Sequence, residues 1–182
     1  MLLRRAGVAF EIRPAELDER PAPGETPRET LARLARAKAE AIAESLGAPR
    51  RLVLGADTGV VLGDTLYGKP TDPADALRML GELAGHTHEV ITAVSLRESV
   101  GGRVWECAVT SRVTMRPADR EELAAYVARG EPLDKAGAYA FQGEGRRLLE
   151  GVDGSQSNVI GLPMEETLAL LADAREALAG AG

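Results

Sequence analysis

The segment Leu54–Val61 reads Leu-Gly-Ala-Asp-Thr-Gly-Val-Val, and shortly after it Gly68–Pro70 reads Gly-Lys-Pro. The apolar residues at the start of this stretch predict a buried strand at Arg51–Ala56, with Asp57 where the strand leaves the sheet. Enzymes built on α/β sheets place catalytic and metal-binding groups at such strand ends. We therefore predict an α/β protein with a functional carboxylate at position 57.

Helix and strand signals alternate on both sides of this segment. Thr26–Glu29 reads Thr-Pro-Arg-Glu, a capping box with proline at the first helical position, and predicts a helix to about Ser45. Further helices are expected from Thr71 to near Gly85, from Asp119 to Gly130 and after Pro163. Strands are expected at Val8–Ile12, in a hairpin around Gly63–Asp64, and at His88–Leu96, Val104–Met115, Ala138–Phe141 and Leu148–Glu150. This mixture predicts a mixed β-sheet flanked by helices, in a single domain spanning residues 1–182.

Composition limits the classes of function. The net charge of −6 argues against a nucleic-acid surface, which needs a basic stripe, although a few local lysines can still bind a nucleotide. Cys107 is the only cysteine, and His86 and His88 lack a third ligand nearby, so we interpret Cys107 and His88 as structural residues. There is no signal peptide and no apolar run of membrane-spanning length, which favours a cytoplasmic enzyme without membrane contact.

Lys38 interrupts the apolar face of the first long helix. Leu31, Leu34, Ala35 and Ile42 share its face at spacings of three and four residues. A lysine in that position either extends along the apolar surface to reach water or meets an anion. The pattern alone leaves both readings open.

Three segments together resemble the Maf family of nucleoside triphosphate pyrophosphatases. They are Leu54–Val61 with its Gly-Ala-Asp-Thr, Asp134–Gly143 with Lys-Ala-Gly-Ala-Tyr and a later Gln-Gly, and Gly154–Pro163. The form of the second segment resembles the branch that acts on dTTP and UTP. The resemblance implies an elongated α/β fold with two lobes and a central cleft. It also implies hydrolysis of the triphosphate to the monophosphate and pyrophosphate with Mg²⁺ or Mn²⁺.

The resemblance also implies roles for seven residues. It assigns catalysis and metal binding to Asp57, metal binding to Glu19, and base selection to Thr58 and Gln142. It assigns phosphate binding to Lys38, Lys69 and Lys135. Each has a plainer interpretation from the residues alone, such as a turn carboxylate, a solvated lysine, a surface acid or the end of a loop.

Two other functions stay open. The same fold could act on a modified or methylated nucleotide, or the chain could be a non-catalytic nucleotide-binding regulator of septum formation. The preferred triphosphate, the metal and the choice between a monomer and a homodimer are open as well.

The family's N-terminal strand and its Ser-x-Ser-Pro-Arg-Arg loop are missing from the sequence as given. Residues 1–7 read Met-Leu-Leu-Arg-Arg-Ala-Gly, which resembles the end of the helix that follows that loop. An isolated helix that short is not expected to hold. Either translation starts upstream or the chain naturally lacks the loop, and we expect the first.

Overall fold

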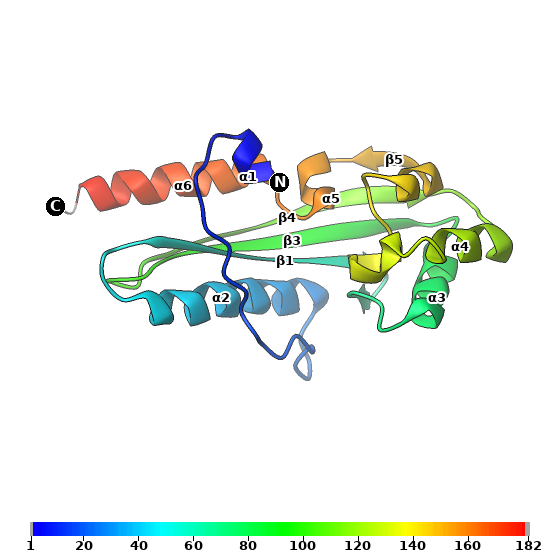
Figure 1. Ribbon diagram of the computed structural model, residues 1–182, viewed down its shortest axis with the longest axis horizontal. Helices are drawn as coiled ribbons and strands as arrows, with labels where there is room; N and C mark the ends of the chain where they lie inside the picture. The colour runs from blue at the N-terminus through cyan, green and yellow to red at the C-terminus, as the bar shows by residue number, and fades with distance from the viewer. Residues whose placement is uncertain (1, 181–182) are drawn as a thin grey trace. The chain divides into compact units, whose positions relative to one another are not determined.

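The computed structural model describes residues 2–180 (Figure 1). Its strands form one five-stranded sheet in the order β2-β1-β3-β4-β5. Their bounds are β1 Leu52–Leu62, β2 Thr65–Tyr67, β3 Thr87–Glu98, β4 Val104–Met115 and β5 Leu149–Asp153. The β1–β2 and β4–β5 pairs are antiparallel. Helices flank this sheet, which confirms the predicted α/β class.

Six α-helices are present among the described residues. They are α1 Leu2–Arg5, α2 Pro27–Leu46, α3 Pro73–Leu83, α4 Arg120–Val127, α5 Gln156–Ile160 and α6 Met164–Ala179. The capping box predicted for α2 is present, since the Thr26 side chain accepts from the Glu29 backbone and the Glu29 side chain accepts from the Thr26 backbone. Asp72 and Asp119 cap α3 and α4 more simply, since their carboxylates accept from the backbone amides of Asp75 and Glu122. Among the described residues, no helix is both long and apolar enough to cross a membrane.

The chain divides into two compact units. The first contains the residues up to Asp57, Thr92–Val109 and those from Gly161 onward. The second contains Thr58–Ile91 and Thr110–Ile160. The division falls within β1, β3 and β4, so each of these long strands begins in one unit and ends in the other.

In the first unit, α2 and α6 cover opposite faces of the strands (Figure 1). Val53 packs with Ala39 and Ala43 of α2. Leu96 packs with Leu171 and Ala174 of α6, and Leu52 and Leu54 contact that cluster. Successive side chains of a strand alternate between its faces, so odd-numbered residues of β1 face α2 and even-numbered ones face α6.

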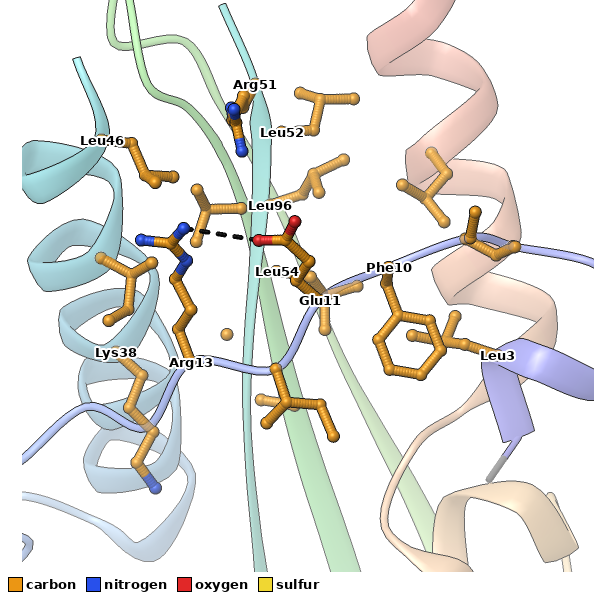
Figure 2. A pocket seen from close by; sticks show the side chains of 18 of the residues that line it. Leu3, Phe10, Glu11, Arg13, Lys38, Leu46, Arg51, Leu52, Leu54 and Leu96 are labelled. Atoms are coloured by element: carbon orange, nitrogen blue, oxygen red, sulfur yellow. Dashed lines mark hydrogen bonds and ion pairs between the residues drawn. The ribbon is translucent and has the colours of Figure 1, made fainter.

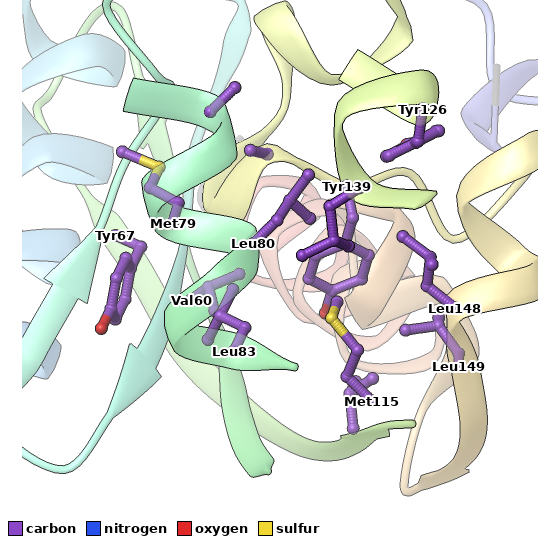
Figure 3. Close-up of a cluster of buried hydrophobic side chains, with 14 of the residues drawn as sticks. Val60, Tyr67, Met79, Leu80, Leu83, Met115, Tyr126, Tyr139, Leu148 and Leu149 are labelled. Atoms are coloured by element: carbon purple, nitrogen blue, oxygen red, sulfur yellow. The ribbon is translucent and has the colours of Figure 1, made fainter. Parts of the chain in front are cut away.

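In the second unit, α3, α4 and the segment after α4 enclose a larger core (Figure 3). Its members include the fully buried Leu80 and Leu83 of α3, Val113 and Met115 of β4, and Tyr139. The core also includes Tyr67 and Tyr126, and Phe141 packs against it.

Two predictions about the elements were wrong. Val8–Ile12 forms no strand, because the sheet order has no place for a strand that would satisfy its backbone groups, and Ile12 is exposed. Ala138–Phe141 is irregular: a 3-10 turn, Ala136–Ala138, ends there with Gly137 and Ala138 at positive φ. The short helix α1 is not isolated, as the sequence analysis had considered it: Leu3 packs against the Leu96 cluster, and this contact supplies stability that the helix's own length cannot.

The position of Asp57 also differs from the prediction. β1 continues through Asp57 to Leu62, so the carboxylate projects from the middle of a long strand and not from its end. The sequence prediction stopped the strand at Ala56 because Asp57 and Thr58 are polar and Gly59 follows. All three are accommodated within the strand.

Candidate active site

Gly55 allows helix α2 to lie unusually close to strand β1. A Cβ atom built on Gly55 would lie 2.2 Å from the carbonyl oxygen of Ala35 and 2.7 Å from the amide nitrogen of Ala39. Both are backbone atoms of the helix, so no side-chain movement could make room. The glycine on the strand and the alanines on the helix therefore set the distance between the two elements.

This close approach positions Lys38 over the strand. Asp57 lies two residues after Gly55 and so projects from the same face of β1, toward α2. The Lys38 ammonium forms an ion pair and a hydrogen bond with Oδ1 of Asp57. It forms a second ion pair with Oε1 of Glu19, at 2.7 Å, from the irregular segment before α2. The structure thus brings together three of the seven predicted residues around one ammonium group.

Burial makes this cluster different from a surface ion pair. The Lys38 and Asp57 side chains are 21% and 14% exposed, whereas Glu19 is 57% exposed. Burial alone lowers the pKa of Lys38, but the hydrogen bonds to Asp57 and Glu19 outweigh it, so the pKa is raised. Lys38 is therefore charged at neutral pH and holds two carboxylates at one point.

We expect Gly55→Ala to disturb both stability and this cluster. The added methyl group must push α2 away from β1, which should lower the free energy of unfolding by about 1–3 kcal/mol. It should also lower turnover, because Lys38 moves with the helix. Chemical denaturation and steady-state kinetics measure the two effects. Gly81→Ala, on α3 with open space around its Cβ, is the control; an equal effect of both substitutions would contradict the role of close approach.

Thr58 follows Asp57 directly but belongs to the second unit. Alternation along β1 directs its side chain to the opposite face of the strand from Asp57. Asp57, predicted to be catalytic, and Thr58, predicted to select the base, are therefore adjacent in sequence but point in opposite directions.

In the second unit, Lys135 forms an ion pair with Asp134, whose carboxylate is also influenced by the charge of Lys69. Lys135 Nζ lies 2.6 Å from Oδ1 of Asp134. That hydrogen bond is the main cause of the lowered pKa of Asp134, and the charge of Lys69 acts in the same direction. The backbone explains the proximity: the amide of Gly137 donates to the carbonyl of Gly68, 3.0 Å away, and ties the Gly68–Pro70 turn to the segment after Lys135.

Gln142 is exposed at the end of that segment. Gly143 beside it has a φ of 103°, and the amide of Glu144 donates to the Glu131 carboxylate at 3.1 Å. The backbone that follows Gln142 is therefore held in place by the hydrogen bond between Glu144 and Glu131.

A cavity lies elsewhere in the first unit. It has a volume of about 850 Å³ and lies beside Leu52–Ala56, beneath the irregular segment after α1 (Figure 2). Its lining is mostly aliphatic, and Lys38 is the only one of the seven predicted residues that contributes. In Figure 2 the Lys38 side chain points away from the centre of the cavity. The cluster around the Lys38 ammonium, and not this cavity, is therefore the candidate site.

The carboxylates of Asp57 and Glu19 suit a hard divalent cation whose other ligands come from a bound substrate. Within residues 2–180, no group of three or more His, Cys, Asp or Glu side chains could enclose a metal ion. Asp57 and Glu19 nevertheless converge on one positive charge. Mg²⁺ is commonly held by one or two carboxylates together with substrate phosphates and water. The two carboxylates fit that pattern.

The sequence analysis missed two contributors to this geometry. Gly55 sets the helix–strand distance, and the signal was available in the small residues Ala35 and Ala39 on the facing helix. Asp134 pairs with Lys135 and is influenced by the charge of Lys69, and no sequence pattern separates it from an ordinary exposed acid.

Comparisons with known proteins agree on one family. The family model described as Maf-like protein matches residues 1–174. A protein named dTTP/UTP pyrophosphatase from Anaeromyxobacter dehalogenans is 51% identical over 172 residues, covering 93% of this chain and 86% of the relative. Proteins of the same name from Gloeobacter violaceus and Geobacter sulfurreducens are 48% and 44% identical, covering 94% and 92% of this chain and 88% and 86% of those relatives. The chain therefore belongs to the Maf family.

Proposed function

We propose that this protein hydrolyses dTTP and UTP to the nucleoside monophosphate and pyrophosphate. The observation that carries the proposal is the cluster in which Lys38 bridges Glu19 and Asp57, in a chain whose relatives are named for that reaction. A carboxylate held by a half-buried ammonium beside a second carboxylate suits water activation next to a phosphate chain.

Asp57 is the general base in this proposal. Its carboxylate accepts a proton from a water molecule, whose oxygen attacks the α-phosphorus. The bond between that phosphorus and the oxygen bridging to the β-phosphate breaks, and pyrophosphate leaves with the bond's electrons. Lys38 fixes the orientation of the Asp57 carboxylate and balances part of the negative charge that gathers at this point.

Asp57 and Glu19 are the residues that would hold a Mg²⁺ or Mn²⁺ ion. Such an ion, when bound, supplies Lewis-acid polarisation of phosphate oxygens. Lys69 and Lys135 neutralise phosphate charge as point charges, and both already lie near the Asp134 carboxylate, which an incoming phosphate would have to compete with. A nucleoside triphosphate substrate supports a cytoplasmic location as part of this proposal. The net charge of −6 suits a small nucleotide better than a nucleic acid.

The direct test is a screen for pyrophosphate release over a panel of nucleoside triphosphates with Mg²⁺ or Mn²⁺. We expect dTTP and UTP to give the highest kcat/KM. A preference for a methylated or otherwise modified nucleotide would reassign the substrate within the family. Binding without turnover of any nucleotide would instead support a non-catalytic regulator.

Gln142→Ala should reduce base discrimination more than overall rate. An amide offers donors and an acceptor that can read a pyrimidine edge, and its loss leaves groups of the correct base unpaired. We expect the ratio of kcat/KM for UTP to that for GTP to fall about tenfold. Gln156→Ala, an exposed glutamine at the start of α5, is the matched control.

If Gln142→Ala lowered kcat/KM equally for all nucleotides, Gln142 would contact phosphate or support the local structure and would not read the base. Thr58→Val tests the second predicted base-selecting residue separately. Because Thr58 projects from the opposite face to Asp57, a selective effect there would have to be transmitted through the strand or through the other face of the sheet.

A further inference from the structure

His88 is a buried polar residue that the proposed reaction does not use. It lies near the start of β3, is 2% exposed, and its Nε2 is 2.8 Å from the hydroxyl oxygen of Tyr139. The two rings also meet edge to face, with centroids 5.4 Å apart. Within the described part of the chain, Nδ1 of His88 has no hydrogen-bond partner. The imidazole therefore has a single polar contact, and that contact is Tyr139.

Burial keeps both members of the pair neutral. It lowers the pKa of His88 to about 4 and raises that of the Tyr139 hydroxyl. One hydrogen bond between an uncharged ring and an uncharged hydroxyl thus joins β3 to Tyr139 throughout the neutral pH range. An aliphatic side chain would fill this core position without a half-satisfied ring nitrogen, so packing alone does not explain a histidine.

Tyr139 lies in the middle of the segment that ends at Gln142. Figure 3 shows its ring in the second unit's core, between Leu80 on one side and Leu148 and Leu149 on the other. The segment has no regular ladder of backbone hydrogen bonds, and Ala138 just before Tyr139 adopts a φ of 59°, which residues other than glycine rarely occupy. Its conformation therefore depends on individual anchors.

Those anchors form a short series along the chain. The Gly137 amide donates to the Gly68 carbonyl at 3.0 Å, beside Lys69. The Ala140 amide donates to the Tyr126 hydroxyl at 3.1 Å. The His88–Tyr139 hydrogen bond lies between these two, and among the three it is the one made by a side chain of the segment itself.

We propose that His88 is a positioning residue for base selection: through Tyr139 it fixes the Gly137–Gly143 segment and thereby the place from which Gln142 meets the base. The inference rests on the proposed function for the role of Gln142. It adds a residue that does not touch the substrate but acts through the hydrogen bond to Tyr139.

Four variants test the assignment. His88→Leu and Tyr139→Phe each remove the hydrogen bond, the double variant removes both partners, and His88→Gln keeps an amide that can reach the hydroxyl. His86→Gln, an exposed histidine whose Nδ1 contacts the Ala84 carbonyl, is the control. The first readout is amide hydrogen exchange of residues 137–143, and the second is kcat and KM for UTP, dTTP and GTP.

We expect His88→Leu and Tyr139→Phe to speed exchange at Gly137 and Ala140 and to lower the ratio of kcat/KM for UTP to that for GTP about tenfold. The double variant should be no worse than either single variant, because both remove the same bond. His88→Gln should restore most of the ratio. A purely structural role would instead lower turnover of all nucleotides by one factor, which would overturn the assignment.

The assignment of His88 as a positioning residue would also be overturned if amide hydrogen exchange in residues 137–143 did not change. It would be overturned as well if the effects of the two substitutions on the kcat/KM ratio added up in the double variant. Failure of the proposed function is recognised separately, because wild-type protein would then release no pyrophosphate from dTTP or UTP. In that case the exchange data would still decide whether His88 fixes the segment, and the assignment to base selection would be rejected.

Discussion

Asp57→Asn should lower pyrophosphate release from dTTP and UTP by about 10²- to 10⁴-fold, the usual cost of losing a general base. Asparagine has nearly the same shape but cannot accept a proton from water at neutral pH. It can still accept a hydrogen bond from Lys38 through its amide oxygen, so the packing between α2 and β1 should persist. Steady-state kinetics, together with equilibrium binding of a non-hydrolysable nucleotide, separate loss of turnover from loss of affinity.

Asp64→Asn provides the control for this substitution. Asp64 is an exposed acid in the turn between β1 and β2, seven residues after Asp57 in the sequence. Its replacement should leave turnover within a small factor of wild type. Full activity in the Asp57 variant would remove this residue from the mechanism.

Lys38→Met should have the second largest effect, a fall in turnover of about 10²–10³-fold, typical for loss of one oriented donor at a developing charge. Methionine keeps the aliphatic stem that lines the cavity beside Ile42 and Leu46. It leaves the Asp57 and Glu19 carboxylates close together without the ammonium that they share. Nucleotide affinity should fall as well, because two uncompensated carboxylates repel a triphosphate.

Arg36→Met is the matched control on the same helix. Arg36 is an exposed cation paired with Glu106, at 2.6 Å, and surface pairs of this kind contribute little. Thermal unfolding of both variants shows whether α2 stays in place. If Lys38→Met and Arg36→Met had equal effects on turnover, the Lys38 cluster would be no more than a structural ion pair.

Most of the regular elements, and the special position of Lys38, could be predicted from the local sequence. Lys38 interrupts the apolar stripe of its helix, which predicted either a side chain lying along the apolar surface or one that meets an anion. Both interpretations hold: the aliphatic part of Lys38 lies along apolar side chains, and its ammonium group contacts two carboxylates. The capping box placed the start of α2 at Pro27, as observed. The local sequence is enough to place the cap and to single out Lys38, but the partners of its ammonium are visible only in the tertiary structure.

The features that sequence reasoning missed depend on tertiary contacts. Strand β1 continues past Asp57 because its neighbours in the sheet continue, and a local pattern cannot show that. The apolar run around Tyr139 looks like a strand, but its side chains are buried by α3 and α4 and its backbone is held by isolated anchors. The assignments of Glu19, Thr58, Gln142 and the three lysines to substrate stay predictions for the variants described above.

The continuity of β1 also limits how this family member can vary in length. A strand alternates its faces with every residue, so one residue inserted or deleted between Gly55 and Asp57 would turn the carboxylate from α2 toward α6. Such a change would separate the acid from Lys38 without altering either residue. Insertions and deletions should therefore be tolerated in the exposed turn at Gly63–Asp64 and rejected within the strand, and a library of single-residue indels scored for growth or activity would show a sharp boundary there.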